Sequence, residues 1–289
     1  MGTQRLVMVV VALIVLAYAC VAQPTAVSST FYYGCGSSNG PYNCNRLPLM
    51  IEGSRVINDS TPADIDANLM PQRTINADTQ TLAKDGYHKQ DHFAAGGAST
   101  HGDSPDHVCG SAWKQCDKPG PYRTMEMMRP DEKYGPARII DITAKIVANP
   151  NYLLSLQDML DHVARYGPIP AKAWVGLKSG GDAVAYDNNA FKGIDATGHN
   201  NFAGWSGDAV YYLVNNTQYN GIFTDRLSVD SGNSWSFEAH YANMGNDHFA
   251  FESVKVDDLR LAPAGCFASV GTPRIQGAPE MNAVITFQC

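Results

Sequence analysis

Hydrophobic and polar positions alternate between two patterns in the second half of the chain. Short runs of apolar, often β-branched residues predict buried strands. The expected strands cover residues 138–146, 171–180, 221–230 and 248–256. The segments between several of these runs repeat apolar residues at helical spacing. Strands that alternate with helices are typical of an α/β domain with some parallel pairing.

Two helices are expected between these strands. In residues 149–167, Ser155 is placed to cap a helix and Gly167 to end it. In residues 206–216, Ser206 would open a second helix. The apolar positions of the first helix are Leu153, Leu156, Met159, Leu160 and Val163.

The N-terminus has the pattern of a secretory signal peptide over residues 1–22. Arg5 precedes an apolar run, and the small residues Cys20 and Ala22 stand before a cleavage point at Gln23. An uncleaved N-terminal anchor is the alternative, because the apolar run is close to the shortest length that spans a bilayer. We expect a secreted protein that does not remain at the membrane after signal cleavage.

Cysteine usage agrees with export. Six cysteines follow the signal segment, and an even set in an exported chain predicts disulfides. A zinc–thiolate site is the competing interpretation, but no C-x-x-C spacing supports it. Two sequons, at Asn58 and Asn215, predict glycosylation in the same compartment. Sequence proximity favours the pairs Cys35–Cys44, Cys109–Cys116 and Cys266–Cys289.

Composition changes this picture little. Charged residues make up 17% and hydrophobic residues 44% of the 289 residues, which indicates a globular protein. The net charge of −7 provides no basic patch to neutralise phosphates, so nucleic-acid binding is not expected.

Residues 23–54 are rich in Gly, Asn and Ser and are predicted to be closed by a disulfide. Residues 55–289 contain no evident linker and are predicted to form one domain.

The segment T-H-G-D-S-P-D-H contains the strongest chemical signal. His101 and Asp103 stand two residues apart, so their side chains project to one face of an extended chain, and His107 follows Pro105. Imidazole and carboxylate groups together suit a divalent ion such as zinc or manganese. A solvated polar loop without a metal is the alternative.

The same segment resembles the H-x-G-T-H-x-D-x-P-x-H signature of the cyclase family of metal-dependent hydrolases, which includes kynurenine formamidases and isatin hydrolases. His240 stands twelve residues before Glu252, as in the second motif of that family. Four segments between the motifs are similar to the family as well. The signature matches are Thr100, His101, Asp103, Pro105 and His107, and the similar segments are residues 135–142, 165–180, 202–213 and 224–230.

The resemblance implies a single-domain α/β protein with the swivelling β/β/α fold, a mixed sheet and assembly into homodimers or homotetramers. It implies hydrolysis of a small-molecule amide, aryl formamide or lactam by water activated on a Zn²⁺ or Mn²⁺ ion. His107 and Glu252 would be catalytic, with His107 a ligand or the group that transfers the proton. The implied metal ligands are His101, Asp103, His107, His240 and Glu252.

The chain departs from the signature at one position of consequence. The first histidine of the family signature corresponds to Gly97, and His92 and Asp91 are the nearest substitutes. Phe93 and Trp205 are expected in the substrate pocket, because the family has pocket residues in both stretches. Two alternatives remain: a non-catalytic secreted binding protein with a weakened metal site, and an extracellular structural protein.

Overall fold

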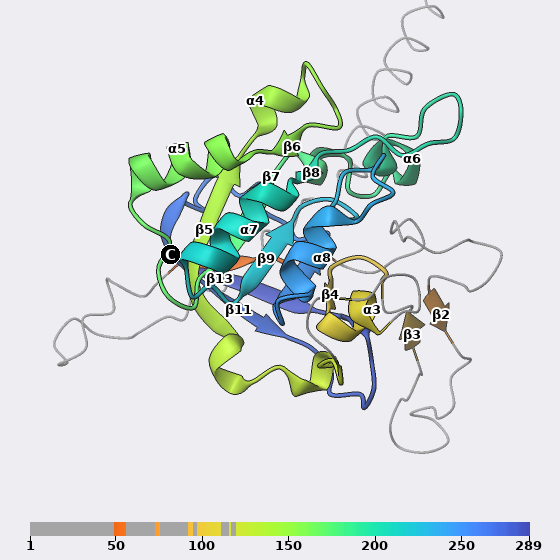
Figure 1. The fold of residues 1–289 in the computed structure, drawn as a ribbon. Coiled ribbons are helices and arrows are strands. Elements are labelled where there is room, and N and C mark those ends of the chain that lie inside the picture. Colours follow the sequence, from red (N-terminus) through yellow and green to blue (C-terminus); the bar gives the residue numbers. More distant parts are fainter. Residues whose placement is uncertain (1–48, 56–72, 76–91, 95–96, 111–115, 117–119) are drawn as a thin grey trace, which may run out of the picture. The chain divides into compact units, whose positions relative to one another are not determined.

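A nine-stranded mixed sheet forms the centre of the computed structural model (Figure 1). The structure describes residues 49–55, 73–75, 92–94, 97–110, 116 and 120–289, all within the unit Ser38–Cys289. The signal segment, Cys35–Cys44, Asn58 and Asp91 lie outside the described residues. The strand order is β1 (Met50–Glu52), β13 (Val284–Gln288), β11 (Ala264–Gly271), β5 (Tyr134–Asp141), β7 (Trp174–Lys178), β9 (Gly221–Thr224), β10 (Phe249–Glu252), β4 (His101–Asp103) and β12 (Glu280–Asn282).

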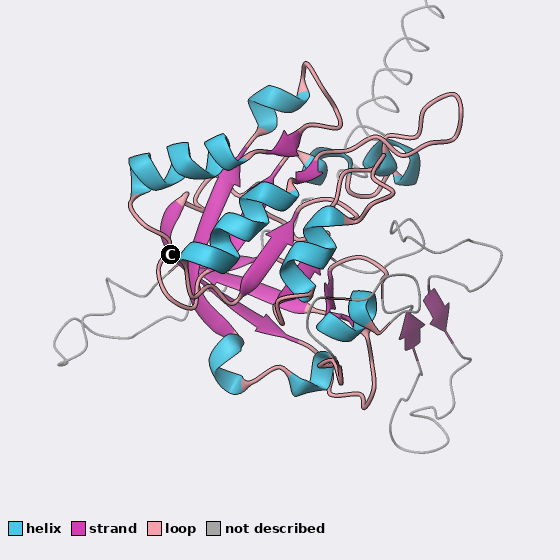
Figure 2. Cartoon of the chain, in the orientation of Figure 1, coloured by secondary structure: helices cyan, strands magenta, loops and turns pink. Residues whose placement is uncertain are grey.

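The sheet is parallel at its centre and antiparallel on both sides. Strands β5, β7, β9 and β10 run parallel, and the remaining pairs are antiparallel. Figure 2 shows helices lying across one face of these strands. The α-helices among the described residues are α3 (Pro105–Cys109), α4 (Thr143–Ile146), α5 (Leu156–Tyr166), α6 (Asn188–Lys192), α7 (Gly207–Asn216) and α8 (Glu238–Met244). The expected α/β class with a mixed sheet is thus confirmed.

Shorter elements complete the description. One two-stranded sheet pairs β2 (Arg73–Ile75) with β3 (His92–Ala94), and another pairs β6 (Leu153–Leu154) with β8 (Gly204–Trp205). The 3-10 helices are η2 (Met125–Met127), η3 (Pro130–Glu132) and η4 (Gly181–Val184).

The central strands bury side chains on both faces, which explains their nearly continuous apolar runs. In β5, Ile140 packs into the core under the helices and Ile139 into a second core on the opposite face. In β10, Ala250 belongs to the first core and Phe251 to the second. Because side chains alternate along a strand, each central strand joins the two cores.

All four expected strands extend beyond the observed ones, since the predicted strands at 171–180 and 248–256 shorten to β7 and β10. The predicted strand at 138–146 is wrong after Asp141, because residues 143–146 form α4. The Asp141 carboxylate accepts hydrogen bonds from both the amide and the hydroxyl group of Thr143, a local turn that ends the strand. The predicted strand at 221–230 likewise ends at Thr224.

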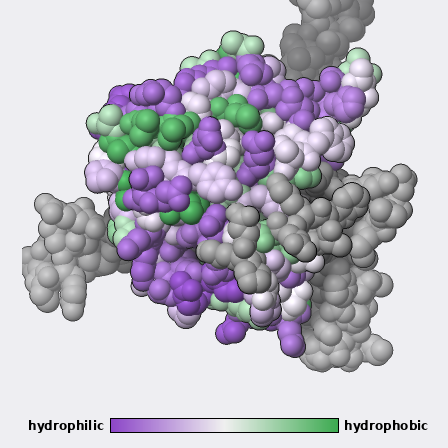
Figure 3. All heavy atoms as spheres, viewed as in Figure 1, coloured by the Kyte–Doolittle hydropathy of each residue, from purple (hydrophilic) through white to green (hydrophobic). Residues whose placement is uncertain are grey.

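Both predicted helix starts are confirmed. The Ser155 hydroxyl accepts the Asp158 amide N–H at α5, and the Ser206 hydroxyl accepts the Ala209 amide N–H at α7. The apolar face of α5 differs from the expectation, since Leu153 lies in β6 before the helix and Leu156 and Leu160 are each 38% exposed. Figure 3 shows apolar side chains gathered over this helix.

Two of the three predicted disulfides are present. Cys109 at the end of α3 pairs with Cys116, and Cys266 in β11 pairs with Cys289 beyond β13. Within the described ranges, no helix is both long and apolar enough to cross a bilayer.

His162 on α5 is buried rather than exposed at the surface. Its side chain packs on Tyr166, and its Nε2 atom has no hydrogen-bond partner in the described part of the chain. Burial, reinforced by the nearby Arg138 guanidinium, lowers the pKa of His162 to about 4.

We expect this histidine to make folding stability sensitive to acid. Between pH 6.5 and 4 the unfolded chain binds a proton at His162 that the folded chain does not, so stability falls as the pH falls. The difference amounts to about 2–3 kcal/mol. Urea unfolding of the wild type and His162→Gln at several pH values measures it. The variant should lose less stability across this window, and identical pH dependence in both proteins would contradict the prediction.

Candidate metal centre

Three adjacent strands bring four of the polar residues to one face of the sheet. Strand β4 pairs with β10 on one side and with β12 on the other. His101 lies opposite Glu252, and Asp103 lies opposite Glu280. Cross-strand partners share a face, and so do residues two apart. The H-x-D spacing therefore places all four side chains on the face covered by helices.

Gly102 makes this arrangement possible. Its missing side chain would point to the opposite face, where a Cβ atom would lie 2.6 Å from a Phe251 ring carbon and 2.7 Å from the Met125 methyl carbon. Any side chain here would push β4 away from the packed core beneath it. Glycine between the two polar residues thus keeps β4 at the correct depth.

Two short helices add the remaining imidazoles. His107 is carried by α3, which follows β4 directly, and His240 is carried by α8 (Figure 1). The ring centroids of the two histidines are 6.1 Å apart. The Cys109–Cys116 disulfide fixes the end of α3, and its Cys116 sulfur lies near Gly245 at the end of α8. The sequence therefore uses a covalent link where short helices alone provide little stability.

The Asp103 and Glu252 carboxylates lie between two imidazoles. Nε2 of His101 is 3.7 Å from Asp103 Oδ1 and 3.3 Å from Glu252 Oε2. Nε2 of His240 is 4.0 Å from Asp103 Oδ2 and 3.4 Å from Glu252 Oε1. Each carboxylate thus directs one oxygen towards each histidine.

The potential ligands form two groups that share Asp103. Ligand atoms of Asp103, His107 and His240 lie within 4.8 Å of one another. Ligand atoms of His101, Asp103 and Glu280 do the same. The structure therefore brings together all five residues that the sequence indicated, and it adds Glu280.

Hydrogen bonds around the cluster fix the direction of each group. Nδ1 of His101 contacts the Ser99 carbonyl oxygen at 2.9 Å, and Nδ1 of His240 contacts Asp230 Oδ2 at 2.5 Å. Both histidines therefore direct Nε2 into the cluster. Oxygen partners of this kind orient metal-binding imidazoles and increase their basicity. The Val229 amide N–H donates to Glu252 Oε1 and holds that carboxylate.

Backbone strain is concentrated beside the cluster. Ser99, Phe237 and Ser253 adopt positive φ angles of 61°, 51° and 54°. Left-handed backbone at non-glycine residues costs on the order of 1–3 kcal/mol each and often accompanies functional sites. All three residues adjoin the cluster: Ser99 holds His101, Phe237 precedes α8, and Ser253 follows Glu252.

The cluster attracts positive charge. Burial opposes protonation of His101, but the Asp103 and Glu252 carboxylates outweigh it and raise the pKa of His101 to about 10. At His240, burial is again outweighed, chiefly by Asp230, and its pKa is raised to about 9. Burial and the neighbouring Asp103 charge raise the pKa of Glu252.

These residues fit a divalent cation. The Asp103 side chain is almost fully buried, yet its Oδ1 atom has no hydrogen-bond partner among the described residues. An unpaired buried carboxylate oxygen is costly unless a cation compensates it. Nitrogen and oxygen donors at these separations match the ligands that zinc and manganese accept.

Sequence reasoning did not identify Asp230 or Glu280. Asp230 accepts the backbone N–H groups of Ala239 and His240 as well as contacting the His240 ring, so it positions both α8 and its histidine. The segment T-D-R-L-S-V-D contained Asp230, but no spacing rule linked it to His240. Glu280 comes from a strand near the C-terminus whose pairing with β4 has no local signal.

The other proposed residues lie elsewhere or are described by backbone alone. Trp205 is buried in the helix-side core, where its Nε1–H donates to the Phe223 carbonyl oxygen. His92 and Phe93 belong to β3, and the structure describes only their backbone. Trp205 therefore packs in the core and not at the cluster.

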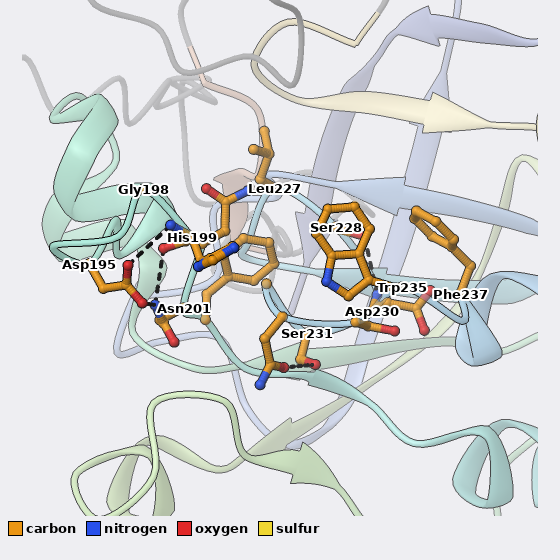
Figure 4. Close-up of a pocket in the computed structure, with 15 residues that line it drawn as sticks. Asp195, Gly198, His199, Asn201, Leu227, Ser228, Asp230, Ser231, Trp235 and Phe237 are labelled. Carbon is orange, nitrogen blue, oxygen red and sulfur yellow. Dashed lines mark hydrogen bonds between the residues drawn. The ribbon is translucent and has the colours of Figure 1, made fainter.

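A pocket of about 570 Å³ lies next to His240 of the cluster, and Figure 4 shows the residues that line it. Its residues Asp230 and Phe237 both contact His240, and the Phe237 ring lies edge-on to the imidazole at 5.7 Å. Figure 4 shows Trp235 and Phe237 at one end of the pocket, with Asp195 and His199 at the other. Trp235 is 83% and Phe237 45% exposed, so both rings are available to a ligand.

Comparison with known proteins agrees with this geometry. The family model described as "Putative cyclase" matches residues 50–231, more than half of the chain. Isatin hydrolase from Roseibium aggregatum is 28% identical over 142 residues, which cover 49% of this chain and 51% of that protein. The chain thus matches about half the length of this curated relative.

Solved structures share the fold. Isatin hydrolase A from Ralstonia solanacearum superposes with a TM-score of 0.72 at 21% identity, covering 83% of this chain and 91% of that one. A structure described as a potential metal-dependent hydrolase with cyclase activity gives a TM-score of 0.58 at 15% identity, covering 83% of this chain and 96% of that one.

Proposed function

We propose that this chain, which belongs to the cyclase family, hydrolyses the C–N bond of a small amide, aryl formamide or lactam with the help of a bound divalent metal ion. The convergence of His101, Asp103, His240 and Glu252 on one buried centre carries this proposal. Similarity to an isatin hydrolase and to a potential metal-dependent hydrolase supports it.

The four converging residues would hold the ion. A bound divalent ion polarises a carbonyl group and lowers the pKa of a water molecule towards about 7, which produces a nucleophile at neutral pH. Zinc and manganese both accept this ligand set.

His107 is suited to transfer the proton. It is half-buried on α3, and its ring nitrogen lies within 4.8 Å of ligand atoms of Asp103 and His240. In the proposed reaction, water adds to the carbonyl carbon and a His107 ring nitrogen accepts its proton. The C–N bond then breaks, and the same nitrogen returns the proton to the departing amine. Glu252 is the alternative proton carrier, because burial raises its pKa.

The adjoining pocket supports a planar, aromatic substrate. Trp235 and Phe237 both line the pocket, the Phe237 ring lies beside His240, and aromatic rings stack favourably on such side chains. Asp230 lines the same pocket and contacts Nδ1 of His240. A ligand that stacks on these rings would bring its carbonyl group next to the cluster.

We further propose that the protein is exported and acts as a homodimer or homotetramer. The Cys109–Cys116 and Cys266–Cys289 disulfides support an oxidising compartment. The signal pattern at the N-terminus points to the same route.

Metal content and hydrolysis test the function directly. The purified wild type should carry a divalent metal by mass spectrometry and should hydrolyse isatin or N-formylkynurenine. His101→Ala should lose most of the metal and lower kcat/KM by at least about 100-fold, because water activation is lost. His162→Gln, a buried histidine outside the cluster, is the matched control. A wild type without metal, or full activity in His101→Ala, would favour the non-catalytic binding protein.

The contact between Asp230 and His240 predicts a second effect. Asp230→Asn keeps the side-chain size but removes the charge that orients His240, so metal affinity should fall by about 10- to 100-fold. Isothermal titration with Zn²⁺ and Mn²⁺ measures this change. Asp258→Asn serves as the control, because Asp258 pairs with Arg260 and is not part of the cluster. Equal affinities for Asp230→Asn and the wild type would refute the positioning role.

A further inference from the structure

We infer that Glu280 is a metal ligand and forms, with His101 and Asp103, an oxygen-rich cation position in a space that Gly97 leaves open. The inference rests on the proposed metal centre but concerns a residue outside both of its sequence motifs. Glu280 also lies beyond residue 231, where the family match ends.

The strand register brings two like charges together. Glu280 on β12 lies directly opposite Asp103 on β4, with both side chains on the same face. Carboxylates in such cross-strand positions repel each other and destabilise the pairing. Ligand atoms of the two residues nevertheless lie within 4.8 Å of each other and of His101. A cation between them converts the repulsion into attraction.

Gly97 provides the room for the Glu280 carboxylate. A Cβ atom at position 97 would lie 3.0 Å from Glu280 Oε2 and 3.5 Å from its carboxyl carbon. Gly97 has no φ in the range that disfavours side chains, and among the described residues the atoms nearest to such a Cβ atom all belong to the Glu280 carboxylate. Positions 97 and 280 thus compete for one space beside His101, and in this chain Glu280 occupies it.

The backbone around Glu280 is fixed on both sides. The Asn282 side-chain amide donates to the Ala98 carbonyl oxygen at 2.8 Å. The Ser104 amide and hydroxyl groups both donate to the Pro279 carbonyl oxygen, at 2.9 and 2.7 Å. The residues that flank Glu280 are therefore held to those that flank β4. This support is what a precisely positioned ligand requires.

The unpartnered oxygen of Asp103 points to the same position. Asp103 is 1% exposed, and its Oδ1 atom is the one that lies 3.7 Å from His101 Nε2 and has no hydrogen-bond partner among the described residues. A cation held by His101, Asp103 and Glu280 would satisfy this oxygen.

The chemistry of the donors predicts which metal the position prefers. His101 supplies its one nitrogen, whereas Asp103 and Glu280 supply carboxylate oxygens, and Glu252 Oε2 lies close to His101. The group around His107 and His240 has two nitrogens instead. Oxygen-rich sites suit hard ions, so the position that includes Glu280 should favour Mn²⁺ more than a nitrogen-rich site does.

Replacing Glu280 tests its role without relying on activity. Mn²⁺ titration followed by electron paramagnetic resonance gives stoichiometry and affinity for the wild type, Glu280→Ala and Glu280→Gln. Both variants should bind Mn²⁺ at least about tenfold more weakly or lose one equivalent. Glu280→Gln keeps the side-chain shape and serves if Glu280→Ala does not fold. Glu126→Gln removes a carboxylate that accepts the Gly277 N–H outside the cluster and is the control.

Two results separate this inference from the proposed function. A wild type that binds no divalent metal would overturn both. A wild type that binds Mn²⁺ and depends on His101, with unchanged affinity and stoichiometry in both Glu280 variants, would overturn only the role of Glu280.

A donor swap tests the shared space. In the Glu280→Ala background, Gly97→His should place an imidazole where the carboxylate was and raise Zn²⁺ affinity above that of Glu280→Ala alone. Equal Zn²⁺ affinity in the single and double variants would refute the competition between positions 97 and 280.

Discussion

Electrostatic repulsion among buried carboxylates is the constraint on which the rest of the centre depends. Asp103, Glu252 and Glu280 converge from three adjacent strands, with Asp103 and Glu252 almost completely removed from water. Negative charges cannot be buried together in this way without positive charge between them. Neighbouring carboxylates raise the pKa values of His101 and His240, so protons supply the positive charge that a metal ion would otherwise provide.

The scaffold resists that repulsion by fixing each element from outside the cluster. Gly102 seats β4 on Phe251 and Met125, so the strand cannot rise from the core without losing packing. A disulfide holds α3, and Asp230 ties α8 through two backbone N–H groups and the His240 ring. The cluster is thus held by packing, covalent and hydrogen-bonded restraints that do not depend on its own charges.

Local pattern was sufficient to predict part of this centre. The two-residue spacing of His101 and Asp103 predicted one face of an extended strand, and β4 has that form. The helix starts at Ser155 and Ser206 were predictable because a hydroxyl cap is a local interaction. The connection of His240 and Glu252 to the first motif came from family resemblance, since no local rule links residues so far apart.

The parts of the fold and of the centre that the sequence did not predict depend on contacts between residues far apart in the chain, which local sequence patterns do not reveal. Phe237, the residue before α8, has a left-handed conformation and provides no side-chain cap, so the start of this helix carries no usual signal. Glu280 stands in a three-residue strand whose register with β4 is set by contacts across the whole domain. Asp141 ended a strand that apolar pattern alone would have continued to residue 146.

The position of β4 in the sheet has a consequence for the order of assembly. This strand is made early, but both of its neighbours, β10 and β12, come from the last part of the chain. Pairings of such large sequence separation form late, because a long loop must close before they contribute stability. The ligands on β4 therefore meet those on β10 and β12 only after synthesis is nearly complete. A metal ion held by residues of all three strands could therefore bind only after the last part of the chain has been made.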